Sequence, residues 1–296
     1  MSSPRGLAGA LFLVIVVAVA SASAQPAGAS HFVWKVSKGT RTIAWLVGSV
    51  HVLSKDVYPL PEIFERAFAE SRVLVEEIDL GATSDPAAVL PVAAMALMTD
   101  GRTLSSLLDQ KTAALVAAKA ADAGVPMLIV DRMKPWLAAM TLAVPALQRA
   151  GFDPALGLDR HFYDRAKSDG RPVRGLETAA SQIDALDKLP MPVQIEMLRT
   201  VLSDVETQVG AVAEIVTAWR RGDIGALESL LLDAFRTAPE VYQRLLVDRN
   251  RAWIPQITGC ATEPSPCFVV VGGAHLVGPD SVVAMLRQAG FSVEQQ

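Results

Sequence analysis

Two of the four histidines in this 296-residue chain occupy the same local pattern. Each follows a glycine by three residues and stands just after an apolar run, in Gly48-Ser-Val-His51 and in Gly272-Gly-Ala-His275. An imidazole can act as a general acid or base near neutral pH, and its neutral form is a common metal ligand. The repeated pattern predicts that both histidines belong to one site. The alternative is that each is a partly buried residue that caps its strand.

A third candidate group is the acidic end of a strand that we expect at residues 72–80, Arg-Val-Leu-Val-Glu-Glu-Ile-Asp-Leu. On a strand, Glu77 and Asp79 would share one face and Glu76 would lie on the other. A buried carboxylate needs a partner, because an unpaired buried charge is costly. The partner of Glu77 is either a metal ion or histidine, which would join it to the histidine pair, or an arginine in a salt bridge.

The strands that would position these residues come from the two ends of the chain. Alternating apolar residues predict a hairpin with strands at 31–36 and 41–47, and a continuous apolar run predicts a buried strand at 267–272. Both histidines would then follow the carboxyl end of a strand, where ligand sites lie in open α/β sheets. We also expect short strands at 171–177 and 291–294.

The remaining sequence is predominantly helical. We expect helices at 61–70 and 279–289, and helical blocks from about 85 to 165 and from 178 to 257. The first block should break at Gly101, residues 124–126, Pro135, Pro145 and Gly151. The predicted fold class is therefore α/β (α+β mixed), with a central sheet built from the N- and C-terminal segments and a large helical middle.

The N-terminus carries the features of a secretory signal peptide. A positive residue, Arg5, precedes an apolar run at 7–20 and a small-residue cleavage site at Ala22-Ser-Ala24. We expect residues 1–24 to be removed, which leaves one domain at 25–296 in the periplasm or outside the cell. The alternative is a retained membrane anchor, for which the run is short.

Cysteine usage and charge agree with an exported protein. The chain has two cysteines, Cys260 and Cys267, and an oxidising compartment would join them in a small disulfide. A two-cysteine metal site would need further ligands nearby, and none stand there. The formal charge of −4 and the lack of a basic cluster with aromatics exclude a nucleic-acid partner.

Several motifs together resemble the TraB/PrgY/GumN family, which is related to the Tiki metalloproteases. They include both Gly-x-x-His segments and the Val-Glu-Glu-Ile-Asp strand. The resemblance runs from Trp34 to the end of the chain and is strongest to the bacterial GumN-like branch. The further matching segments are Asp248-Arg249-Asn250, Lys134-Pro-Trp136, Gly157-Leu-Asp159, Gly175-Leu-Glu177-Thr, Gln182, Trp219-x-x-Gly222-Asp223 and Gly273-Ala-His275-Leu-Val-Gly278.

The resemblance implies a fold related to the erythromycin-esterase and ChaN-like group, and it implies a metal site. In Tiki proteins, the two histidines and the strand glutamate are required for metal-dependent proteolysis. Carried over, these are His51, His275 and Glu77, which would hold a divalent ion such as Mn, Co or Zn. Glu77 is chosen over Glu76 because Glu77-Ile-Asp79 matches the Glu-x-Asp pattern of the family.

The same resemblance extends the site to other residues. Arg249 would bind a substrate carboxylate or stabilise an oxyanion. Its alternative role is an ion pair with Asp248 or with the acids of the strand. Asn250 would orient a ligand or donate a hydrogen bond. Glu177 and Gln182 would line the same cleft. The alternative is that Glu177 caps a helix and that Gln182 lies on the surface. His161 has no paired glycine and is expected to be structural.

Three functions fit these observations. The first is a metal-dependent hydrolase of peptides or small molecules, and the second is a metal-free, esterase-like hydrolase in which a histidine acts as general base with support from Glu77. The third is a non-catalytic envelope protein that binds a peptide or acts in polysaccharide export. A serine hydrolase is not expected, because Ser49 does not stand in a Gly-x-Ser-x-Gly elbow.

Overall fold

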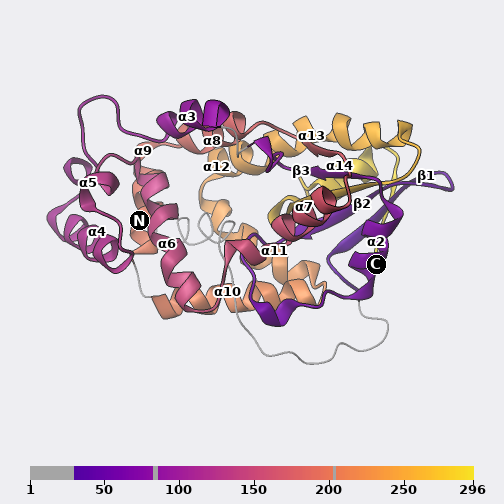
Figure 1. Ribbon diagram of the computed structural model, residues 1–296, viewed down its shortest axis with the longest axis horizontal. Helices are drawn as coiled ribbons and strands as arrows, with labels where there is room; N and C mark the ends of the chain where they lie inside the picture. The colour runs from indigo at the N-terminus through magenta and orange to yellow at the C-terminus, as the bar shows by residue number, and fades with distance from the viewer. Residues whose placement is uncertain (1–29, 83–85, 203–204) are drawn as a thin grey trace.

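The computed structural model describes residues 30–82, 86–202 and 205–296, so the predicted signal peptide lies outside the described residues (Figure 1). Within them, the strands form a six-stranded sheet in the order β4-β3-β5-β2-β1-β6. No helix of the described residues is long and apolar enough to span a membrane. The strands are β1 (Val33–Lys38), β2 (Arg41–Ser49), β3 (Val73–Glu76), β4 (Val173–Gly175), β5 (Cys267–Gly272) and β6 (Ser292–Gln295).

The predicted fold class is confirmed, including a sheet drawn mainly from the two ends of the chain. Strands β4, β3, β5 and β2 run parallel, while β1 is antiparallel to both β2 and β6. In the register, Ser49 at the end of β2 faces Gly272 at the end of β5, and Glu76 at the end of β3 faces Val270. The carboxyl ends of the three central strands therefore lie side by side.

Helices cover the sheet and extend away from it. Figure 1 shows the strands together at the right of the view, with α3 to α6 and α9 reaching to the left. The helices are α2 (Glu62–Glu70), α3 (Pro86–Met95), α4 (Gln110–Asp122), α5 (Met127–Val130), α6 (Pro135–Arg149), α7 (Leu158–Ser168), α8 (Ala179–Asp187), α9 (Met191–Val201), α10 (Val205–Arg220), α11 (Ile224–Leu232), α12 (Pro239–Tyr242), α13 (Asp248–Gly259) and α14 (Val282–Gln288).

Two sequence-based expectations about local structure are wrong. Pro145 lies inside α6 and does not end it; the residues around it, Ala143, Ala146 and Leu147, are buried, so packing outweighs the lost hydrogen bond. Strand β3 ends at Glu76, not near residue 80, and the chain bends immediately afterwards. The expected alternation of faces therefore does not extend to Glu77, which leaves the sheet at the strand end.

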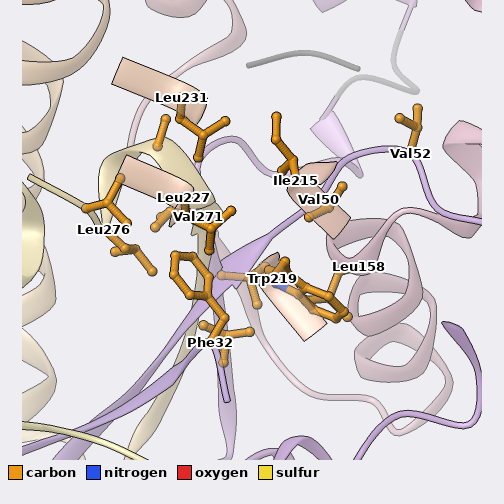
Figure 2. Close-up of a cluster of buried hydrophobic side chains, with 14 of the residues drawn as sticks. Phe32, Val50, Val52, Leu158, Ile215, Trp219, Leu227, Leu231, Val271 and Leu276 are labelled. Atoms are coloured by element: carbon orange, nitrogen blue, oxygen red, sulfur yellow. The ribbon is translucent and has the colours of Figure 1, made fainter. Parts of the chain in front are cut away.

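A buried apolar cluster supports the ends of β2 and β5. Figure 2 shows Phe32, from just before β1, and Trp219, from α10, packed with Val271 and Leu276 at and just after the end of β5. The indole Nε1 of Trp219 donates to the Gly48 carbonyl at 2.7 Å. A Cβ at Gly48 would lie 2.0 Å from the Phe32 ring, so the first Gly-x-x-His motif needs its glycine for close packing.

The predicted disulfide between Cys260 and Cys267 is confirmed, and it closes the short loop that leads into β5. Cross-linking the two ends of the loop removes conformational freedom from the unfolded chain. We therefore expect the Cys260→Ser, Cys267→Ser variant to lose about 2 kcal/mol of unfolding free energy in a urea titration. Reduction of the wild-type protein should reproduce the loss. Equal unfolding free energies for the oxidised, reduced and double-serine forms would contradict this expectation.

Glu76 is a buried carboxyl in the core, only 2% exposed. Burial raises its pKa to about 9, and the nearby carboxylates of Asp159, Asp79 and Asp164 add to the effect. The folded protein therefore holds Glu76 in its protonated form at neutral pH.

The Glu76→Gln variant should be more stable than the wild type at neutral and alkaline pH. In the unfolded chain Glu76 ionises above about pH 4.5, so folding must take up a proton, and wild-type stability falls as the pH rises from there towards 9. Glutamine has the same shape and needs no proton. We expect its advantage to be small at pH 5 and roughly 2 kcal/mol or more at pH 8, measured by urea unfolding. Glu62→Gln, at an exposed position, serves as the control and should show no such trend.

Candidate functional site

The strand ends bring both histidines and Glu77 to one point, the Cα of Gly272. A Cβ placed there would lie 3.1 Å from Glu77 Oε1, 3.3 Å from His51 Nε2 and 3.7 Å from His275 Cδ2. The backbone N–H of Gly272 donates to Glu77 Oε1 at 2.7 Å. The second Gly-x-x-His motif therefore needs its first glycine because a side chain would fill the space between the three groups.

His51 is held through its Nδ1 atom. That atom lies 3.1 Å from Asp159 Oδ1 on α7, and the Ser49 hydroxyl donates to the same oxygen at 2.6 Å. Burial lowers the pKa of His51, but the Asp159 carboxylate outweighs it, with a smaller contribution from Glu77, and raises this pKa to about 9. His51 is the more accessible of the two imidazoles, with 35% of its side chain exposed.

His275 is held through Nδ1 as well, but it is 1% exposed and neutral. The Asn250 amide nitrogen donates to the Asp280 carbonyl at 2.8 Å, which leaves its oxygen facing His275 Nδ1 at 2.6 Å. The proton of His275 is therefore assigned to Nδ1 from this network, and Nε2 is the acceptor. Burial, followed by the Arg249 cation, lowers the pKa of His275 to about 3.

Arg249 lies between the acids of the site and is 14% exposed. Its Nη2 donates to Glu77 Oε2 and to Glu177 Oε1, both at 2.6 Å, and its Nη1 lies 3.1 Å from His275 Nε2. Gln182 Nε2 donates to Glu77 Oε2 at 2.9 Å. Burial raises the pKa of the Glu77 carboxyl, but Arg249, the two histidines and the backbone N–H outweigh it and hold that pKa well below its usual range.

The structure therefore brings together every residue that the sequence suggested for the site. Glu77 forms the salt bridge with an arginine that the sequence left as an alternative, and the arginine is Arg249. Arg249 forms a second ion pair with Glu177. The residues that meet are His51, Glu77, Glu177, Gln182, Arg249, Asn250 and His275.

Sequence reasoning missed the role of Asp159. Its only signal was the Gly157-Leu-Asp159 motif, and nothing in the sequence shows that this segment contacts His51, 108 residues away. A Cβ at Gly157 would lie 2.3 Å from the His51 carbonyl oxygen, so the glycine allows the start of α7 to reach His51.

His161 points away from this site, as expected of a structural residue. It lies two residues after Asp159 on α7, which places it on the other side of the helix. Its ring packs on Tyr58 with 4.9 Å between centroids, and it lines a pocket of about 580 Å³ with Lys55, Leu156 and others. That pocket contains none of the residues that surround Gly272.

The groups around Gly272, two imidazoles and a carboxylate, are of the types that bind divalent ions. Both imidazoles are anchored through Nδ1 by an oxygen, the arrangement typical of metal-binding histidines. His275 Nε2 lies 3.9 Å from Glu77 Oε1, whereas two ligands about 2.1 Å from one tetrahedral ion are about 3.4 Å apart, so this pair would have to close slightly around an ion. Across the described ranges, no three or more His, Cys, Asp or Glu side chains are placed so that they could hold a metal ion together. Arg249 occupies the side of His275 Nε2 where an ion would bind.

Replacement of Asp159 by Asn should lower the pKa of His51. The Asp159 carboxylate is the main reason that this pKa is high, and an amide keeps the size of the side chain without its charge. In the metal-free protein, we expect the NMR titration midpoint of His51 to fall by at least one pH unit from about 9. His161 should titrate unchanged in the same spectra. An unshifted His51 would show that Asp159 does not set its charge.

Comparison with known proteins agrees with the residues that form the site. The model described as the TraB/PrgY/gumN family matches residues 32–295. The relatives include two proteins described as uncharacterized protein YbaP. That of Shigella flexneri is 24% identical over 261 residues, which cover 87% of this chain and 94% of the relative. That of Escherichia coli (strain K12) is 25% identical over 242 residues, which cover 82% and 87%. No solved structure matches the chain. Because the family model covers nearly all of the described residues, including the whole site around Gly272, this chain belongs to the TraB/PrgY/gumN family.

Proposed function

We propose that the chain is an exported, metal-dependent hydrolase of peptides or other small substrates. The observation that carries the proposal is the arrangement of the two histidines, which are anchored through Nδ1 and lie with the Glu77 carboxylate around Gly272. Export is supported by the Cys260–Cys267 disulfide, since such bonds persist in oxidising compartments.

His51 Nε2, His275 Nε2 and Glu77 Oε1 would hold a divalent ion such as Mn, Co or Zn. A bound ion of this kind supplies Lewis-acid polarisation of a carbonyl and activation of a water molecule. Asp159 and Asn250 fix the orientation of the two rings by holding Nδ1, which leaves each Nε2 as the atom that would bind the ion.

Two of the polar groups suit the substrate. The Arg249 guanidinium lies beside Glu77 and can donate to an oxygen that gains negative charge during the reaction. The partial exposure of the His51 side chain would leave the ion that it holds open to an approaching substrate. Glu177 holds Arg249 in place through contacts with Nε and Nη2.

A metal-free hydrolase is the second candidate, and the His51–Asp159 pair favours it. A histidine whose Nδ1 is held by a carboxylate is the arrangement of a general base with its orienting acid. Under this hypothesis, Arg249 and the Gly272 N–H stabilise the negative charge of Glu77. They would also be the donors available to a substrate oxygen. Activity after exhaustive chelation would separate this candidate from the first.

Replacement of His51 and His275 by Ala, singly and together, should remove both metal and cleavage. We expect the purified wild type to hold about one divalent ion per chain by elemental analysis and each variant to hold less than about a tenth of that. Cleavage of a peptide library should fall at least about a hundredfold. His161→Gln, a histidine outside the site, is the matched control and should keep both properties.

The outcomes discriminate between the functions. Unchanged metal content in the double variant would reject the proposed site, and full activity in chelator would favour the metal-free hydrolase. An intact wild-type protein that cleaves no peptide or ester, while its cellular function survives in the double variant, would favour a binding protein of the envelope.

A further inference from the structure

The contacts of Arg249 fall into two groups that differ in their partners. One group reaches the histidine–glutamate cluster through Nη1 on His275 Nε2 and Nη2 on Glu77 Oε2. The other group involves residues outside the cluster. There, Nε and Nη2 donate to Glu177, and Nη1 also donates to the Leu245 carbonyl at 3.1 Å. Because Nη1 and Nη2 take part in both groups, the guanidinium has to move to release the cluster, and Glu177 can pair with it after that movement.

The first group of contacts competes directly with a metal ion. A neutral imidazole has one lone pair at Nε2, and in His275 that lone pair already accepts a hydrogen bond from Arg249. Glu77 also has its negative charge balanced by the same guanidinium. A divalent ion bound to both would lie next to a second positive charge in a buried site, where like charges repel strongly.

Glu177 offers the guanidinium a place to withdraw. Its carboxylate is 11% exposed and receives three of the contacts from Arg249, including the short one from Nη2 at 2.6 Å. The Trp253 ring, with its centroid 4.9 Å from Arg249 Cζ, adds a cation–π contact on the same helix. Neither partner belongs to the ion's donor set.

We propose that Arg249 is a built-in competitor for the metal ion. In the metal-free protein its guanidinium holds His275 and Glu77, and when a divalent cation binds it withdraws onto Glu177. This inference rests on the proposed function, since it concerns the ion of the same site, but it makes a separate statement about affinity. Arg249 weakens ion binding and Glu177 strengthens it.

The test measures the dissociation constant for Mn²⁺ in chelator-treated protein without substrate, with free Mn²⁺ quantified by electron paramagnetic resonance. Arg249→Gln should bind Mn²⁺ about tenfold more tightly than the wild type, since it removes a like charge and a competing hydrogen bond from the site. Glu177→Gln should bind it more weakly, because the arginine then has only Glu77 as its anionic partner. Arg251→Gln is the matched control, because Arg251 is exposed on the same helix and carries the same charge.

Each outcome has a definite meaning. Equal or weaker binding by Arg249→Gln, or tighter binding by Glu177→Gln, overturns the inference and leaves the proposed metal site standing. A gain that persists in the Arg249→Gln, His51→Ala double variant overturns it too, because the extra affinity would then arise elsewhere. Absence of binding in the wild type and in Arg249→Gln overturns both the inference and the metal-dependent function. Because the Glu177 and Arg249 variants are expected to shift affinity in opposite directions, a general loss of folding cannot imitate the result.

Discussion

The Glu77 carboxylate is the charge around which the polar part of this protein is arranged. It is 9% exposed at the end of a parallel strand, where an ionised group is stable only if other groups replace the water that it has lost. Three donors from distant parts of the chain do this: the Gly272 N–H, the Gln182 amide and the Arg249 guanidinium. The positions of β5, α8 and α13 relative to β3 are thus linked through one side chain.

Close backbone approach is what allows the surrounding groups to reach Glu77. Gly48 lets Phe32 pack under the end of β2, and Gly157 lets the start of α7 touch the His51 carbonyl. Gly272 leaves the space into which the two imidazoles and the carboxylate project. At each of the three glycines, a Cβ atom would come too close to a residue of the site or to a residue that packs beneath it. The absence of a side chain at these positions therefore has a steric cause.

Much of the fold could be predicted from the sequence because its signals are local. The hairpin of β1 and β2 and the buried strand β5 follow from periodicity, and their ends locate His51 and His275. The end of β3 could not be predicted, because a run of apolar and acidic residues does not show where the backbone leaves the sheet. The partnership of Asp159 with His51 was also hidden, since it joins a helix to a strand end through tertiary contacts alone. Pro145 was misread because helix α6 is stabilised by packing that its own sequence does not display.

The neighbouring residues Glu76 and Glu77 show how environment decides chemistry. Both are buried and share the same sequence context, yet their pKa values are shifted in opposite directions. Glu76 remains within the strand and lies near other carboxylates, so burial dominates and the group stays protonated. Glu77 lies one residue further, where the chain has turned toward Arg249 and the histidines, and it stays ionised. Since a carboxyl group needs its negative charge to hold a cation, the position where β3 ends would favour Glu77 over Glu76 as a ligand in the proposed metal site. The same choice follows from the Glu-x-Asp pattern, but here it has a physical cause in the geometry of the strand end.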